Sequence, residues 1–230
     1  MNKISLIAAA GLVAVTVSSA HANLINWDTV GNLGTETSEP STANASGVGP
    51  SSLSLGAGVT AAGNGNRFGG SGWWNTGNTA LGSTLAEAVT GNDFIEFTAT
   101  PDAGFTVTAE AFTFVWDRSS TGPSSVTLRS SADSFVGDLG SVTGLVQAGV
   151  ATTTLQTINF ADFSFTIPTT FRLYGFGGTA TGGTAGFDTV AAGALGQITP
   201  NVTLVGTAIP EPTTLGLIAA GSLVMLRRRK

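Results

Sequence analysis

The 230-residue sequence contains no cysteine and a single histidine, His21. The lack of cysteine excludes disulfide bonds and thiolate metal sites, so a folded domain must be stabilised by its core alone. His21 lies in an N-terminal segment that we expect to be removed. Downstream of that segment, Ser–His and Cys–His nucleophilic catalysis and imidazole-ligated metals are therefore excluded as well.

Basic residues are also scarce. The chain has 9 Lys and Arg against 14 Asp and Glu, a formal net charge of −5. Five of the cations lie at the two ends, so residues 23–209 keep four arginines, thirteen carboxylates, no lysine and a formal charge of −9. The lack of lysine excludes Schiff-base chemistry there. An acidic surface repels phosphate backbones, which argues against nucleic acid as a partner.

Long apolar runs are confined to the two ends of the sequence. At the N-terminal end, Lys3 precedes an apolar run from Ile4 to Val17, and Ala20-His21-Ala22 has the small-x-small pattern of a cleavage site. This order predicts a helical signal peptide over residues 1–22, cut by signal peptidase before Asn23. A permanent membrane anchor is disfavoured because the run is short, rich in alanine and followed by the cleavage site.

The C-terminal end combines a turn, an apolar run and a basic cluster. Its parts are Pro210-Glu211-Pro212, residues 213–226, and Arg227, Arg228, Arg229 and Lys230. Fourteen helical residues span about 21 Å, against roughly 30 Å of bilayer hydrocarbon, and snorkelling basic side chains can cover part of the difference. We expect a short transmembrane helix with its basic end in the cytoplasm and the rest of the chain outside. A core or amphipathic helix is disfavoured because the run has no polar face.

This C-terminal segment resembles the PEP-CTERM sorting signal of exported proteins in Gram-negative bacteria. The resemblance implies recognition and removal of the signal, residues 208–230, by an exosortase, an intramembrane cysteine transpeptidase. It gives Pro210, Glu211 and Pro212 a recognition role, with the cluster Arg227, Arg228 and Arg229 completing the motif, and gives no residue a catalytic role. It further implies an inner-membrane intermediate, and then a place at the cell surface or in an extracellular matrix containing polysaccharide.

Between the two ends the sequence predicts an all-β fold. Apolar residues alternate with polar ones in short windows bounded by Gly, Pro, Ser and Asn, the pattern of half-buried strands. The alternating sets are Ile95/Phe97/Ala99, Phe105/Val107/Ala109, Phe112/Phe114/Trp116, Val126/Leu128, Phe163/Phe165/Ile167, Phe171/Leu173 and Val202/Leu204. The change of parity between the second and third sets predicts a bulge near Glu110-Ala111. A short helix is expected at residues 84–89.

Strands at this spacing predict one antiparallel β-sandwich over residues 23–207. Residues 32–65 and 177–196 are poorly patterned, and long loops, irregular edge strands and local disorder all remain open there. The glycine-rich string at residues 69–72 is interpreted as a turn. Residues 92–98, 122–131 and 171–175 resemble jelly-roll domains common in PEP-CTERM proteins, which are similar to galactose-binding-like and carbohydrate-binding modules; this resemblance spans residues 92–206.

Carboxylates offer the remaining route to catalysis. Glu96, Glu110 and Asp117 lie in or beside predicted strands and could form a glycosidase-type acid pair. We favour ordinary surface charges instead, with Asp117 and Arg118 as a local ion pair or turn cap, and expect no catalytic residue. Calcium could be held by oxygens near Asn92-Asp93, Asp28 or Asp188, but no ordered acidic loop of the EF-hand type is present. We expect no metal or cofactor.

Binding has a candidate in Trp73, Trp74 and Asn75, which lie in a Gly/Asn-rich segment. An exposed indole could stack on a sugar ring while Asn75 bonds its hydroxyls; alternatively, one Trp fills the core and the other packs a loop. The favoured function is thus a non-enzymatic exported surface or matrix protein associated with extracellular polysaccharide. The alternative is a carbohydrate-binding module using the tryptophans, and a carboxylate-based glycan-degrading enzyme is the least favoured.

Overall fold

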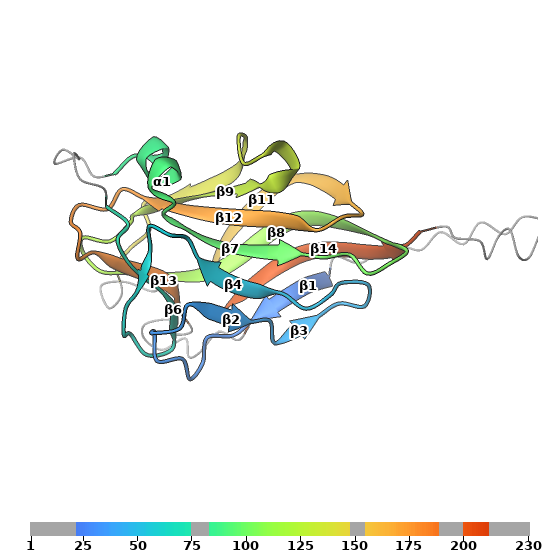
Figure 1. Ribbon diagram of the computed structural model, residues 1–230, viewed down its shortest axis with the longest axis horizontal. Helices are drawn as coiled ribbons and strands as arrows, with labels where there is room; N and C mark the ends of the chain where they lie inside the picture. The colour runs from blue at the N-terminus through green and yellow to red at the C-terminus, as the bar shows by residue number, and fades with distance from the viewer. Residues whose placement is uncertain (1–21, 75–82, 148–154, 189–199, 212–230) are drawn as a thin grey trace, which may run out of the picture.

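The computed structural model describes residues 22–74, 83–147, 155–188 and 200–211. These residues form two antiparallel β-sheets stacked face to face, which confirms the predicted all-β sandwich (Figure 1). Successive strands often change sheet, so the two layers are held together by the chain itself as well as by the core. The jelly-roll resemblance stays a prediction, since an all-β sandwich is compatible with it without specifying it.

The first sheet has eight strands. Seven follow the order β3-β1-β14-β8-β13-β6-β5, and β11 also pairs with β8. Their bounds are β1 Ala22–Trp27, β3 Ala43–Asn44, β5 Thr60–Ala61, β6 Arg67–Ser71, β8 Phe105–Arg118, β11 Leu155–Phe165, β13 Thr184–Asp188 and β14 Val202–Pro210. The long β8 is the centre of this sheet, because β11, β13 and β14 all pair with it.

The second sheet has six strands in the order β10-β9-β12-β7-β4-β2. Their bounds are β2 Ser38–Pro40, β4 Ser52–Leu55, β7 Phe94–Ala99, β9 Ser125–Ser130, β10 Asp138–Thr143 and β12 Thr169–Phe176. A short 3₁₀ turn, Ser131–Asp133, links β9 to the loop before β10. At one margin of the sandwich Gly140 of this sheet lies against Ile158 of the other.

The expected bulge in β8 is confirmed. Ala111 faces Val205 of β14 and Ala109 faces Gly206, so Glu110 is the extra residue. β11 shows a register shift at the same place, between Asn159 and Phe163. Because the bulge changes the parity of β8, both Val107 and Phe112 can face the core although five positions separate them.

The core is aromatic and lies between the two sheets. Phe97 is 2 % exposed and stacks on Phe112 and Phe171, with ring centroids 5.2 and 5.1 Å apart, and packs against Trp27 at 4.9 Å. Phe114, Trp116 and Phe187 continue the cluster with edge-to-face contacts. The contacts of Phe97 with Phe112 and Trp27 join the two sheets. Together the aromatic contacts supply the packing that a chain without disulfides requires.

One helix, α1 Leu85–Gly91, covers part of the outer face of the six-stranded sheet (Figure 1). Thr84 and Glu87 form a capping box at its start, and Asn92 ends it in the left-handed conformation. Its buried Ala88 packs with Phe94 and Tyr174. The short helix expected at residues 84–89 is thereby confirmed, shifted by one or two residues.

Two expectations about glycine-rich segments need revision, and one open alternative is decided. The glycine string at 69–72 is not a turn: Gly69, Gly70 and Ser71 belong to β6. The segment 177–196 contains β13, which lies inside the first sheet between β8 and β6. The segment 32–65 contains the short strands β2, β3, β4 and β5, so of the open alternatives the irregular strands apply there.

The expected signal helix before Ala22 and the apolar helix at 213–226 lie outside the described residues. Across the residues with a described position, none of the helices combines the length and apolar character needed to cross a membrane.

Candidate functional site

The sandwich strand β14 runs directly into the C-terminal Pro-Glu-Pro sequence. Ile209 and Pro210 of this strand face Thr106 and Phe105 of β8. The backbone N–H of Glu211 then donates a hydrogen bond of 2.7 Å to the carbonyl of Gly104. β14 thus continues three residues past the expected domain end at 207, and two residues of the Pro-Glu-Pro sequence are held by the fold.

The partner of this strand end is the turn before β8. The N–H of Phe105 donates to the carbonyl of Asp102 over 3.0 Å, and Gly104 adopts a φ of +79°, which glycine tolerates at little cost. Residues 102–105 therefore form a tight turn. It presents the Gly104 carbonyl to Glu211.

Within the described residues, the last four residues of β14 are paired on one side only. On the other side of the strand, β1 pairs with Val202–Gly206 and begins at Ala22 opposite Gly206. Thr207–Pro210 therefore form an open strand edge next to the start of the described chain. Because backbone groups alternate in direction along a strand and Glu211 donates toward β8, Pro210 faces the open side, where its missing N–H leaves no hydrogen bond unmade.

Exposure rises along this edge toward the Pro-Glu-Pro sequence. Thr207 is 8 % exposed, Ala208 packs partly against the core, and Ile209 is 43 % exposed. Pro210 is exposed too. The strand is therefore buried up to Thr207 and leaves the core within three residues. Of the other predicted processing residues, Ala22 is the first residue of β1, whereas Ala20, Pro212, Arg227, Arg228 and Arg229 lie outside the described residues.

The predicted sugar-binding tryptophans do not form an exposed pair. Trp73 is 1 % exposed, donates its indole N–H to the carbonyl of Gly70 over 2.7 Å, and packs edge-to-face on Trp116 at 5.8 Å. Its ring cannot stack on a sugar in this position, which corrects that candidate and confirms the core interpretation. Trp74 is half-buried, and Asn75 lies outside the described residues.

The three candidate carboxylates lie apart in different environments. Glu96 is on β7 and accepts a hydrogen bond of 2.9 Å from Arg172. Glu110 is the bulge residue of β8. Asp117 is buried in the first sheet and forms an ion pair with Arg67. This corrects the expectation of a local ion pair or turn cap between Asp117 and Arg118. Arg118 instead donates to the carbonyls of Leu145, Ser119, Ser120 and Gly122.

Arg67 lies between two carboxylates. Besides Asp117 it faces Asp188, 3.7 Å from the same guanidinium nitrogen, and all three residues are at most 9 % exposed. Burial lowers the pKa of Arg67, and the negative charge of Asp188 opposes that shift. A guanidinium held by two carboxylates is a structural charge cluster, and it takes Asp117 and Asp188 away from the roles suggested for acid catalysis and for calcium.

The outer face of the six-stranded sheet carries a row of four charges that sequence reasoning missed. Each charged residue lies opposite the next one on the neighbouring strand: Asp138 on β10, Arg129 on β9, Arg172 on β12 and Glu96 on β7. The two central arginines are directly opposite, an unfavourable arrangement that the flanking carboxylates offset through bonds of 2.6 Å from Arg129 to Asp138 and 2.9 Å from Arg172 to Glu96. The signal that could have found the row is the recurrence of single charges at polar positions of predicted strands.

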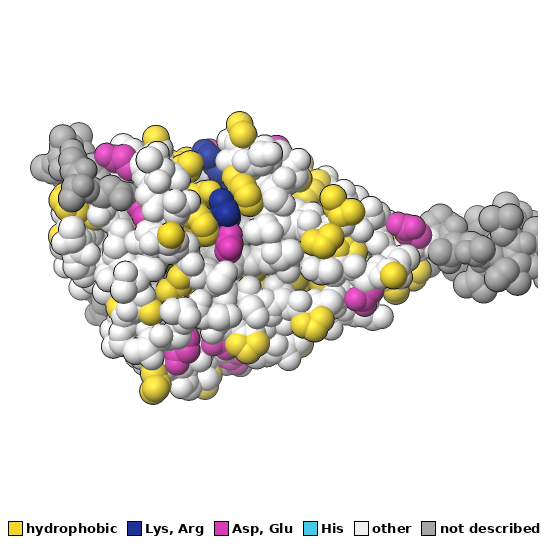
Figure 2. Space-filling model, in the orientation of Figure 1, with side chains coloured by type: hydrophobic (Ala, Val, Ile, Leu, Met, Phe, Trp, Pro, Cys, Tyr) yellow, Lys and Arg dark blue, Asp and Glu magenta, His cyan; other side chains and the backbone are white. Residues whose placement is uncertain are grey.

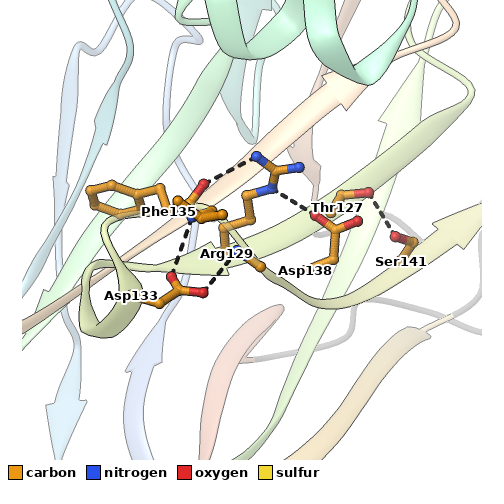
Figure 3. A network of polar contacts seen from close by, with 8 residues as sticks. Thr127, Arg129, Asp133, Phe135, Asp138 and Ser141 are labelled. Atoms are coloured by element: carbon orange, nitrogen blue, oxygen red, sulfur yellow. Dashed lines mark hydrogen bonds and ion pairs between the residues drawn. The ribbon is translucent and has the colours of Figure 1, made fainter.

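The loop before β10 is hydrogen-bonded to Arg129 of this row (Figure 3). Ser134 and Phe135 both have positive φ, 64° and 61°, which is rare outside glycine. Asp133 accepts bonds from the backbone of Val136 and Gly137, and Arg129 donates to the carbonyl of Phe135 over 3.0 Å. The Arg172 guanidinium carbon lies 4.0 Å from the centroid of the Phe135 ring and 4.3 Å from the centroid of the Phe94 ring. Away from this group, Figure 2 shows a face with few charged side chains.

The remaining metal candidates are also separate. Asp28 accepts a bond from the N–H of Val30 and caps a turn, while Asp93 is fully buried behind α1. Within the four described stretches of chain, no group of three or more His, Cys, Asp or Glu side chains is placed to hold a metal ion.

Comparison with known proteins adds one finding to this geometry. The model of the PEP-CTERM protein-sorting motif matches residues 208–230. The chain is a PEP-CTERM-containing protein. Neither a curated protein nor a solved structure matches it.

The PEP-CTERM motif begins inside β14, at Ala208, and takes in the residues whose pairing is described above. Its presence implies an exported protein that is sorted by an exosortase and processed at the membrane on the way to the cell surface. The functional site that the structure and the motif together define is therefore the junction of the sandwich with its sorting signal.

Proposed function

We propose that this PEP-CTERM protein is a non-enzymatic surface or extracellular-matrix protein of a Gram-negative bacterium, associated with extracellular polysaccharide. The observation that carries the proposal is how the fold meets its terminal segments. β14 ends at Pro210, inside the sorting motif, and Asn23, the first residue after the predicted signal peptidase site, is already paired in β1. Removal of both flanking segments would leave the sandwich and its core complete.

The side chains of the sandwich support a non-catalytic role. Glu96 and Asp117 are held in ion pairs on different sheets, and Glu110 sits in a bulge. A glycosidase needs two carboxyl groups facing one substrate across about 5–9.5 Å, one of them free to exchange a proton. An assay for new reducing ends on a panel of bacterial polysaccharides checks this part. Activity that disappears in an Asp117→Asn or Glu96→Gln variant would contradict it.

The sorting part is tested in the native host. Wild-type protein should be recovered outside the inner membrane as a species that starts at Asn23 and lacks Arg227–Lys230. A variant with Pro210, Glu211 and Pro212 replaced by alanine should stay full-length at its C-terminus and remain with the membrane. Intact-mass measurement of each fraction distinguishes the two. Equal distribution and equal mass for both proteins would remove the sorting role.

The association with polysaccharide needs its own test. Trp74 retains some exposed surface, whereas Trp73 is enclosed, so Trp74 is the candidate for stacking on a sugar ring. In affinity electrophoresis on gels containing the host's polysaccharide, wild-type protein should be retarded and a Trp74→Ala variant less so. Retardation unchanged by Trp74→Ala would exclude that residue, and no retardation of the wild type would exclude the association.

A further inference from the structure

The start of the sorting motif is structurally part of the sandwich. Ala208, Ile209 and Pro210 are opposite Val107, Thr106 and Phe105, and Glu211 is bonded to Gly104. An enzyme that recognises Pro210-Glu211-Pro212 therefore meets two of these residues already engaged by β8 and its turn. The folded domain and the enzyme compete for the same short segment of backbone.

The reach of the motif is short while this pairing persists. Thr207 is buried, and three strand residues span only about 10 Å, so Pro210 reaches no more than about that distance beyond the buried part of the strand. The headgroup layer on one side of a bilayer is itself about 5–8 Å thick. An intramembrane peptidase would thus have to draw the domain against the membrane surface. Release of Thr207–Pro210 from β8 adds about 13 Å of free chain.

We propose that Thr207–Pro210 form a detachable strand end, and that the exosortase acts on the precursor only after this end has separated from β8. The inference rests on the proposed sorting function. The pairing of the described residues makes the separation local: Thr207–Pro210 have β8 on one side alone, whereas Val202–Gly206 are held between β1 and β8. The strand can therefore open up to Gly206 while the core strands stay in place.

The absence of cysteine allows a clean test of this opening. Thr106 and Ile209 face each other across β8 and β14, and opposite Cα atoms in such a pair are about 5.5 Å apart, within the range a disulfide spans. In the oxidising compartment outside the inner membrane, a Thr106→Cys/Ile209→Cys precursor should cross-link the strand end to β8. We expect its processing, followed by pulse–chase and intact mass in the exosortase-carrying host, to slow at least tenfold and to recover when reductant is added.

Matched controls separate locking from other effects of the cysteines. The single variants Thr106→Cys and Ile209→Cys should be processed as the wild type is. Thr98 and Thr170 form a second cross-strand pair, half-buried and on the other sheet, with hydroxyl oxygens 2.8 Å apart. A Thr98→Cys/Thr170→Cys variant also carries one disulfide through export but leaves β14 free. The processing of this variant should equal that of the wild type.

A rescue variant tests the reason for the block. Insertion of Gly-Ser-Gly-Ser between Ile209 and Pro210 of the cross-linked variant supplies about 13 Å of chain without opening the strand. We expect this insertion to restore processing. Failure of the rescue, or wild-type processing of the Thr106→Cys/Ile209→Cys precursor, overturns the detachable strand end. Wild-type processing of the variant with alanine at Pro210, Glu211 and Pro212 would instead refute the sorting function itself.

Discussion

The adjacent residues Trp73 and Trp74 differ in what their side chains contact, and a pair of alanine variants should show the difference. Trp73 is enclosed by the sandwich and hydrogen-bonded to Gly70. Trp73→Ala should lower the free energy of unfolding by about 3–5 kcal/mol, because it leaves a large cavity and removes the contact with Trp116. Trp74→Ala, which opens no comparable cavity, should cost about 1 kcal/mol or less. Urea denaturation measures both, and equal losses would contradict the assignment of Trp73 to the core.

The arginines Arg67 and Arg172 should differ in how much each contributes to stability. Arg67→Met leaves Asp117 and Asp188 buried together without a cation, which should cost about 3–5 kcal/mol of unfolding free energy. Arg172 is more exposed, and its pair with Glu96 and its stacking on Phe94 and Phe135 should together be worth about 1–2 kcal/mol. Chemical denaturation of both methionine variants checks the order. A smaller loss for Arg67→Met than for Arg172→Met would refute a structural role for the buried cluster.

Residues that act alone could be assigned from sequence, but partnerships between distant residues could not. The processing signals at both ends are local patterns, and the family model bears out the C-terminal one. The partner of Asp117 is Arg67, fifty positions away, and nothing near Asp117 in the sequence indicates it. The pairing of Pro210 with Phe105 likewise depends on the register of two strands, which alternation alone does not fix.

Among the strands, large apolar residues decided what could be predicted. The structure confirms the five strands that place Val, Leu, Ile or Phe at alternate positions, namely β7, β8, β9, β12 and β14. β6 and β13 escaped prediction because glycine takes several of their positions. The backbone of Phe68 lies where a Cβ on Gly186 would be, so these two strands approach too closely for side chains at that point. A glycine-rich sequence there reflects a tight strand pairing instead of a turn.

The fold should require the extra residue in β8, whereas the side chain of Glu110 should be replaceable. Deletion of Glu110 shifts the parity of one half of the strand, which would turn either Val107 and Ala109 or Phe112, Phe114 and Trp116 out of the core. We expect the deletion variant to lose its cooperative thermal transition. Glu110→Ala keeps the residue count and should change the free energy of unfolding by about 1 kcal/mol or less. Circular dichroism melts of the two variants test this, and a folded deletion variant would contradict the role of the bulge.

For the whole molecule, the pairing of the described strands implies that the sandwich is an autonomous folding unit. Residues 23–211 keep every described strand pairing except that of Ala22, together with the entire aromatic core. The chain carries a formal charge of −9 between residues 23 and 209, so its solubility does not depend on the terminal segments. The sorting motif joins this unit at the strand edge Thr207–Pro210, which is paired only with β8 among the described residues.

That edge should behave as the weakest part of the domain. Its one-sided hydrogen bonds each contribute about 0.5–1.5 kcal/mol, and ordering each residue costs about 1–2 kcal/mol, so the two effects nearly cancel. A chain ending at Gly206 should therefore lose no more than about 2 kcal/mol of unfolding free energy relative to residues 23–211. In hydrogen exchange on the longer chain, the amides of Ile209 and Glu211 should exchange much faster than those of Val202–Gly206, because a strand end opens without global unfolding. Equal protection along all of β14 would mean that the motif is released only when the whole sandwich unfolds, and the exosortase would then require an unfolded substrate.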